Sequence, residues 1–135
     1  MTKIESKKVT VPASAADVFN FLSNTNNIER LLPTDKISNW TSDGKACSFK
    51  VQNAYQIGLE LTENTPNTNV RYKSTAGTPF PFQLNVTLNE VDGKTEAQLL
   101  CEAEINMFLE MMVKGPLKNL FDYMADKLTT QFVTA

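Results

Sequence analysis

The clearest pattern in the sequence is the alternation of apolar and polar residues between positions 82 and 105. Residues 82–88 alternate strictly, and residues 97–105 alternate again after the dipeptide Asp92-Gly93. A period of two is typical of β-strands, and Asp-Gly between two such segments indicates a hairpin. We therefore expect two antiparallel strands with one solvated face and one covered face.

Weaker alternation extends the predicted sheet towards the N-terminus, from about residue 34. Turn residues occur at 42–44 and 64–67, so several short antiparallel strands are expected around them. Residues 3–11 predict a further strand, which Pro12 ends.

Three segments have the three- or four-residue spacing of apolar residues that is typical of helices. Residues 15–23 predict a short helix, and residues 28–32 predict a second helical turn that Pro33 closes. The longest segment runs from about residue 108 to residue 132 and predicts an amphipathic helix. Gly115-Pro116 interrupts it, so we expect a kink or a fresh helix start there.

Three stretches of the chain resemble a known family. They are the opening from Val9 to Leu22, in which a strand runs into a helix, the sequence Thr-Pro-Phe-Pro-Phe at 78–82, and the terminal helix. Together with the order of the elements, they resemble the START and pollen-allergen superfamily, also called SRPBCC, which includes polyketide cyclase/dehydrase and lipid transport proteins.

The resemblance implies an α+β helix-grip fold. In this fold a curved antiparallel sheet of about seven strands wraps around a long C-terminal helix, two short helices follow the first strand, and a cavity lies between sheet and helix. Members include lipid carriers, polyketide cyclases, chaperone-ATPase activators and a toxin that blocks ribosome association. Fold alone does not choose among these functions.

Length and charge narrow the choice of function. A chain of 135 residues predicts one domain that spans residues 1–135, and the formal charge of -2 argues against a nucleic-acid partner. No apolar run approaches the roughly 20 residues that cross a bilayer, and the N-terminus lacks the apolar core of a signal peptide. We therefore expect a cytoplasmic protein without membrane insertion, in which Cys47 and Cys101 are reduced core residues.

The most informative feature of the composition for possible chemistry is the absence of histidine. It removes the usual general base, the commonest metal ligand and every histidine-dependent nucleophile. The sequence also lacks a CxxC pair and the glycine-rich nucleotide motifs, so we predict no catalytic residues, no metal and no cofactor, and favour a binding protein over an enzyme.

Strand parity also places several polar residues and Trp40. Glu60, Glu102 and Glu104 alternate with apolar neighbours and should point away from the core, as should Arg71. Trp40 should lie on the opposite face from Ile37, unless a bulge intervenes.

The residues that we predict to line the cavity are apolar or aromatic and come from both the sheet and the long helix. They are Phe49, Tyr55, Tyr72, Phe80, Phe82, Leu117, Phe121 and Met124. Tyr55 and Tyr72 could orient a mostly apolar ligand through their hydroxyl groups. Each of these residues could instead pack in the hydrophobic core without lining a cavity.

Three functions remain open. The leading hypothesis is the binding of a small hydrophobic or lipid-like ligand between the sheet and the C-terminal helix. An enzyme of the polyketide cyclase/dehydratase kind is the first alternative, and it rests on the resemblance alone. The second alternative is a protein-interaction module or a homodimer, because the segment from Phe108 to Lys114 has more apolar residues than one buried helical stripe can hold.

Overall fold

The computed structural model describes residues 2–51, 55–75, 78 and 80–132, except the side chain of Tyr55. Within this part of the chain, eight strands form one antiparallel sheet, and the helices α1, α2 and the 3₁₀-helix η1 pack against it. In chain order the elements are β1 (Thr2–Glu5), β2 (Val9–Val11), α1 (Ala15–Leu22), η1 (Thr25–Leu31), β3 (Ile37–Ser42), β4 (Ala46–Val51), β5 (Tyr55–Leu61), β6 (Asn69–Ser74), β7 (Phe82–Val91), β8 (Lys94–Ala103) and α2 (Met107–Thr130).

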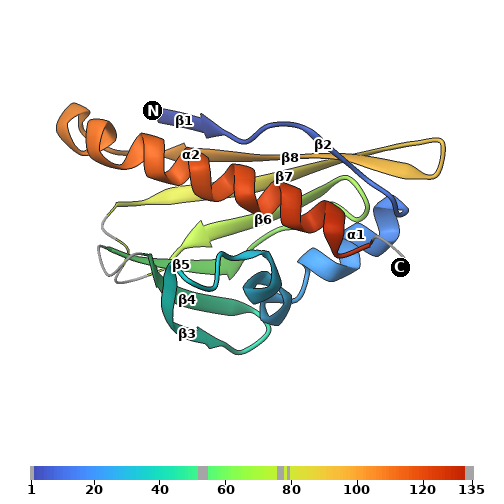
Figure 1. Ribbon diagram of the computed structural model, residues 1–135, viewed down its shortest axis with the longest axis horizontal. Helices are drawn as coiled ribbons and strands as arrows, with labels where there is room; N and C mark the ends of the chain where they lie inside the picture. Colours follow the sequence, from blue (N-terminus) through green and yellow to red (C-terminus); the bar gives the residue numbers. More distant parts are fainter. Residues whose placement is uncertain (1, 52–54, 76–77, 79, 133–135) are drawn as a thin grey trace.

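The sheet has the order β1-β8-β7-β6-β5-β4-β3, and β2 also pairs with β8. It curves around α2, which crosses one face diagonally, while α1 and η1 lie at the C-terminal end of that helix (Figure 1). The buried apolar side chains fill the space between this face and the helices. The predicted α+β helix-grip architecture is confirmed.

The predicted hairpin forms between β7 and β8. Val91 pairs with Lys94, and both turn residues have positive φ, 54° for Asp92 and 79° for Gly93. Positive φ at both central positions is the geometry of a type I′ turn, whose twist matches that of the strands it connects. This hairpin therefore sets the register of the two longest strands.

The prediction of one strand over residues 3–11 is wrong, because the strand breaks between β1 and β2. Ser6 still bonds to β8, since its N–H donates to the Leu99 carbonyl over 2.9 Å and its side-chain oxygen accepts from the Leu99 N–H over 2.9 Å. The chain then turns away from the sheet, and the N–H of Lys7 donates to Asp122 Oδ1 of α2 over 2.7 Å. The break serves a contact with α2, which strand periodicity alone does not reveal.

α2 continues through Pro116 as a single helix, so of the two expected outcomes, a kink or a fresh start, the fresh start does not occur. Pro116 is exposed, and no atom lies within 4 Å of a Cβ placed on Gly115. On an exposed helix surface, water can bind the carbonyl group that proline leaves unpaired. The helix therefore tolerates the proline without ending there.

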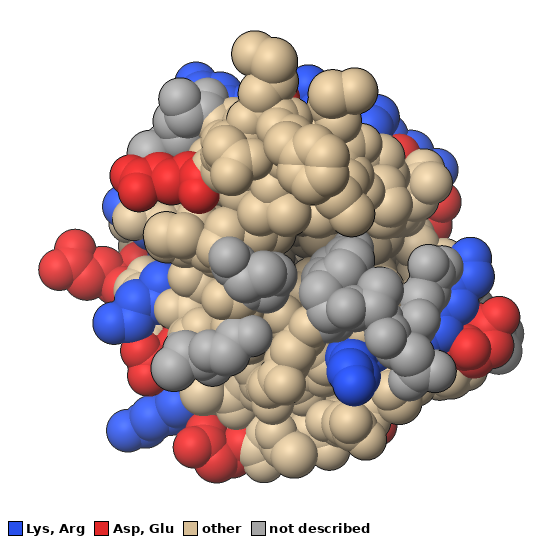
Figure 2. All heavy atoms as spheres, turned by 90° about the vertical axis from the view of Figure 1, so that its left-hand side faces the viewer, with Lys and Arg blue, Asp and Glu red and all other residues tan. Residues whose placement is uncertain are grey.

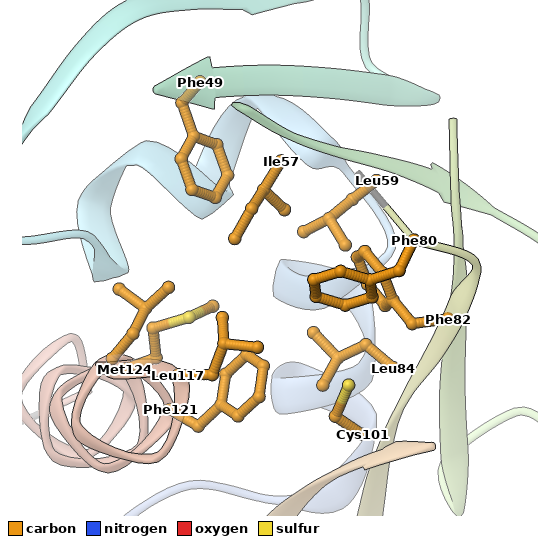
Figure 3. Close-up of a pocket in the computed structure, with 11 residues that line it drawn as sticks. Phe49, Ile57, Leu59, Phe80, Phe82, Leu84, Cys101, Leu117, Phe121 and Met124 are labelled. Carbon is orange, nitrogen blue, oxygen red and sulfur yellow. The ribbon is translucent and has the colours of Figure 1, made fainter. Parts of the chain in front are cut away.

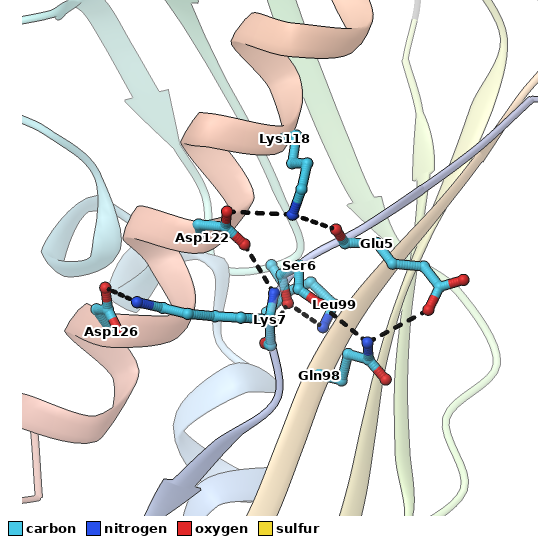
Figure 4. Close-up of polar contacts among 8 residues, drawn as sticks. All are labelled: Glu5, Ser6, Lys7, Gln98, Leu99, Lys118, Asp122 and Asp126. Atoms are coloured by element: carbon cyan, nitrogen blue, oxygen red, sulfur yellow. Dashed lines mark hydrogen bonds and ion pairs between the residues drawn. The ribbon is translucent and has the colours of Figure 1, made fainter.

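Polar contacts attach one side of α2 to the linker between β1 and β2 (Figure 4). Besides its bond from Lys7, Asp122 forms an ion pair of 3.2 Å with Lys118. The Lys118 ammonium also donates to the Glu5 carbonyl over 3.3 Å, and Lys7 forms an ion pair of 2.6 Å with Asp126. The middle of the helix is thereby fixed along the β1 side of the molecule.

A β-bulge interrupts β3. Asn39 has a φ of 56°, and the register with β4 shifts between Ser38 and Thr41. The shift places Trp40 on the inner side, where its ring stacks on Phe49 with centroids 6.1 Å apart. The bulge that the sequence left open is therefore present, and Trp40 lies on the opposite face from the one that strand parity predicts. One additional residue reverses the direction of the side chains that follow.

Candidate functional site

An apolar pocket lies where the inner face of the sheet meets α2 (Figure 3). Six of the predicted residues line it: Phe49, Phe80, Phe82, Leu117, Phe121 and Met124. Five residues that were not predicted to line the cavity complete the lining: Ile57, Leu59, Leu84, Cys101 and Leu120. The site therefore combines strands β4, β5, β7 and β8, together with Phe80 before β7, with residues 117–124 of α2.

Simple periodicities bring these side chains together. In β4 and in the first part of β7, every second residue is buried, which directs Phe49, Phe82 and Leu84 to the inner face. In α2, Leu117, Phe121 and Met124 recur at helical spacing and face the sheet (Figure 3). The apolar character of the pocket follows directly from the sequence pattern.

The pocket has little free space. Its volume is ≈ 10 Å³, which is about what a single water molecule needs. The described side chains therefore fill the space in which a ligand-sized cavity was expected. A ligand that binds here must displace side chains or α2 itself.

The two predicted tyrosines have different outcomes. The side chain of Tyr55 lies outside the described residues. Tyr72 is 1% exposed, does not line the pocket, and donates its hydroxyl hydrogen to the carbonyl of Leu22 at the end of α1. Burial raises the pKa of this hydroxyl far above its usual value. The hydroxyl of Tyr72 is thus bonded to the backbone, and its role towards a ligand stays a prediction.

Cys101 is the one ionisable residue among the described pocket lining. It is a free, buried cysteine, and burial raises the pKa of its thiol to about 12. Cys47 is also free and buried, with a pKa raised to about 12 by burial. A thiol with such a pKa stays protonated at neutral pH and is a poor nucleophile.

The charged residues that strand parity directed away from the core lie outside the pocket. Glu60 forms an ion pair of 3.2 Å with Lys73, and Glu104 is exposed. Arg71 is exposed too, and its Nε donates to Asn69 Oδ1 over 3.2 Å. None of these groups is placed to act on a molecule in the pocket.

A second hollow, which we call the cleft, lies beside α2 on the flank away from β1. It has a volume of ≈ 470 Å³ and is lined by Pro33, Asp35, Lys36, Val51, Pro116, Asn119, Leu120 and Tyr123. Three segments far apart in the sequence form it, which explains why no sequence pattern indicated it. Leu120 lines both the cleft and the apolar pocket.

The N-terminal end of α2 carries exposed apolar side chains, as the sequence analysis expected for some of this segment. The exposed fractions are 78% for Met107, 74% for Phe108, 81% for Met111 and 59% for Met112. Residues at this spacing share one face of a helix. They project over the end of the molecule that Figure 2 shows, where uncharged side chains gather at the top. Val113, by contrast, is buried.

No protein-family model and no curated protein matches the sequence. Solved structures, however, share its fold. The START superfamily protein from Mycobacterium smegmatis is 14% identical, with a TM-score of 0.74 and 96% of each chain covered. XoxI from Bacillus cereus is 12% identical, with a TM-score of 0.75, and the match covers 98% of this chain and 96% of that one.

A protein from Chromobacterium violaceum is 12% identical with a TM-score of 0.75, and both chains are covered completely, at 100%. Identities this low establish the fold alone. The chain therefore has the START-like helix-grip fold that its sequence resembled. Across the described residues, no helix combines the length and the apolar character that a membrane crossing requires.

Proposed function

We propose that the protein binds a small hydrophobic or lipid-like molecule between the sheet and α2. The observation that carries this proposal is the pocket lining, to which both layers contribute apolar side chains only. A START-like fold is in general a ligand-binding fold, which agrees with this proposal. Two buried free thiols favour a cytoplasmic setting, where cysteines stay reduced.

The pocket must open for a ligand to enter, because its free volume is only ≈ 10 Å³. Burial of about 250 Å² of apolar ligand surface provides about 6 kcal/mol at about 25 cal/mol per Å². This gain must offset the loss of freedom on association and the displacement of packed side chains, since even a few extra methylene groups in a packed core cost about 1–3 kcal/mol. Met124, whose side chain is unbranched and flexible, can move at lower cost than a branched residue.

Native mass spectrometry of the purified protein tests the proposal first. We expect a bound apolar compound that is released on denaturation, or saturable one-to-one binding of an apolar fluorescent probe. Met124→Trp should place a bulkier side chain where the ligand would bind and abolish binding, whereas Met111→Trp on the exposed face of α2 should not. Circular dichroism shows whether both variants are folded. A ligand-free mass together with no saturable probe binding would refute the proposal.

Self-association through the exposed end of α2 is a second candidate function. The four side chains offer an apolar patch on the order of 500 Å², near the upper end for an ordinary monomer surface. A stable interface buries about 800 Å² on each partner, so the patch would need a rim of neighbouring residues in a two-fold dimer. Continuity of the patch on one helix face favours pairing with the same face of a second copy.

Sedimentation velocity over a concentration series tests the homodimer. We expect a dimer for the natural sequence and a monomer for the double variant Phe108→Ser, Met111→Ser. Val91→Ser is the matched control, because Val91 is also an exposed apolar residue but lies at the β7–β8 hairpin. A monomer at the highest attainable concentration would exclude this candidate.

A polyketide cyclase-like reaction gains no support from the described lining. Such a reaction needs a group that transfers protons beside the substrate. The described lining contains no carboxylate and no tyrosine, and the Cys101 thiol stays protonated at neutral pH.

A further inference from the structure

The two sides of α2 that flank its inner face have different surroundings. On one flank, Lys118, Asp122 and Asp126 contact residues 5–7 through the hydrogen bonds and ion pairs of Figure 4. On the other flank lies the cleft, between α2 and the segment that joins η1 to β3. The polar contacts thus restrain α2 on the β1 side, and the space for movement lies on the cleft side.

The cleft adjoins the apolar pocket directly. β4 contributes Phe49 to the pocket and Val51, two residues later on the same face, to the cleft. Leu120 of α2 belongs to both linings and is 6% exposed. Leu120 is thus the one described residue that the two linings share.

The lining of the cleft is amphipathic. Pro33, Val51 and Leu120 are buried and form an apolar base, whereas Lys36, Asn119 and Tyr123 are exposed. A volume of ≈ 470 Å³ lies within the range of about 300–1,000 Å³ that is typical of small-molecule sites. The cleft thus has the size and the polarity gradient of a site for one end of an amphipathic molecule.

Two ammonium groups lie at or beside the cleft and could bind an anion. Lys36 lines it, and the ammonium of Lys127 lies 5.8 Å from the ring centroid of Tyr123, another lining residue. Within the described part of the chain, neither ammonium has an ion-pair partner. In the described lining itself, Lys36 is the one ammonium group and Asp35 the one carboxylate, and Lys127 adds a second ammonium group beside the lining.

We propose that the cleft is the entrance to the pocket and the site for the polar end of its ligand, an amphipathic acid with an apolar body and one anionic group. Leu120 separates the two spaces and moves when the apolar body passes into the pocket. Lys36 then pairs with the anionic group at the surface. This inference rests on the proposed binding function, to which it adds a ligand class and a route.

The test uses two ligands that differ in their end group, decanoate and decan-1-ol, and two pairs of matched variants. Lys36→Gln removes the cleft ammonium, and Lys94→Gln removes an exposed lysine at the distant β7–β8 hairpin. Leu120→Ala removes the separating side chain, and Leu128→Ala truncates a buried leucine of α2 that lines neither space. Affinities come from calorimetry and association rates from stopped-flow fluorescence.

We expect Lys36→Gln to weaken the binding of decanoate about threefold at low salt and to leave that of decan-1-ol unchanged, because a surface ion pair contributes modestly and is screened by salt. Lys94→Gln should change neither affinity. Leu120→Ala should raise the association rate of both ligands several-fold, whereas Leu128→Ala should not.

Two results would overturn the inference, and they differ in what they imply for the binding function. If both ligands bind but each cleft variant behaves like its control, the cleft is not the route, while ligand binding in the pocket stands. If neither ligand shows saturable binding to the natural sequence, the proposed function fails and the inference fails with it.

Discussion

The hydroxyl group of Tyr72 offers the sharpest test of how the interior is organised. It joins β6 to α1 by donating to the carbonyl of Leu22, the last residue of that helix. The last carbonyl groups of a helix have no partner within it, so this one depends on an outside donor. Tyr72→Phe removes the donor and keeps the ring, which leaves the packing nearly unchanged.

The expected loss of stability follows from the burial of both groups. Tyr72 is 1% exposed and Leu22 is 2% exposed, so water has little access to the abandoned carbonyl. A buried polar group that loses its partner costs about 1–3 kcal/mol. For a chain of this length, about 2 kcal/mol corresponds to a decrease in melting temperature of roughly 6–10 °C.

Urea denaturation followed by circular dichroism measures the free energy of unfolding, with Tyr123→Phe as the control for stability. Tyr123 is an exposed tyrosine, so its variant should stay within about 0.5 kcal/mol of the natural sequence. Ligand affinity should be unchanged in Tyr72→Phe, because the ring does not line the pocket. If Tyr72→Phe leaves the free energy of unfolding unchanged but weakens ligand binding, this reasoning is refuted and Tyr72 belongs to the binding site.

The pH dependence gives an independent check on the same bond. Burial raises the pKa of Tyr72 above its unfolded value, so the folded protein keeps a proton that the unfolded chain releases at about pH 10. The stability contributed by the neutral hydroxyl is complete below that pH and is lost as the pH rises beyond it. The difference in stability between the natural sequence and Tyr72→Phe should therefore shrink above about pH 10.

Three further predictions concern stability. Gly115→Ala should raise the free energy of unfolding by about 0.5–1 kcal/mol, since the added Cβ meets nothing within 4 Å and alanine favours the helix. Gly58→Ala should lower the free energy of unfolding by about 1–3 kcal/mol, because the new Cβ would lie 1.7 Å from Thr75 Oγ1. Adding Thr75→Ala should restore part of this loss. Urea denaturation measures the free energy for the Gly115 and Gly58 variants. Burial raises the pKa values of Cys47 and Cys101 from 9.0 to about 12, so the folded protein keeps thiol protons that the unfolded chain releases. Stability should therefore fall as the pH rises from about 9 towards 12. Replacing both cysteines by alanine should make this fall smaller when denaturation is measured as a function of pH.

Local patterns were sufficient to predict the elements whose partners are close in sequence. The alternation of residues 82–88 and the Asp92-Gly93 turn determine β7, β8 and their register, because a two-residue hairpin leaves one pairing. The same alternation correctly directs Phe82 into the pocket. Features that depend on distant contacts were beyond such patterns, as the break after β1 shows, where Lys7 binds a helix residue far along the chain.

The features of the candidate site also separate into those that local patterns predict and those that depend on distant contacts. Periodicity identifies which side chains face α2, but the free volume among them depends on the rotamers and on the position of the helix. Hence the apolar character of the pocket could be predicted, whereas its volume of ≈ 10 Å³ could not. Likewise, parity turned Tyr72 inward, but the carbonyl of Leu22 that binds its hydroxyl comes from another element.

The bulge in β3 also affects how this sheet meets other chains. β3 is the last strand on its side of the described sheet, and a last strand presents hydrogen-bonding groups on which a foreign strand can assemble. At Asn39 the backbone enters the left-handed region and the ladder loses its regular spacing. An incoming strand would therefore find only short stretches on either side of the bulge to pair with. The residue that turns Trp40 towards the core thus also protects the sheet against aggregation from its edge.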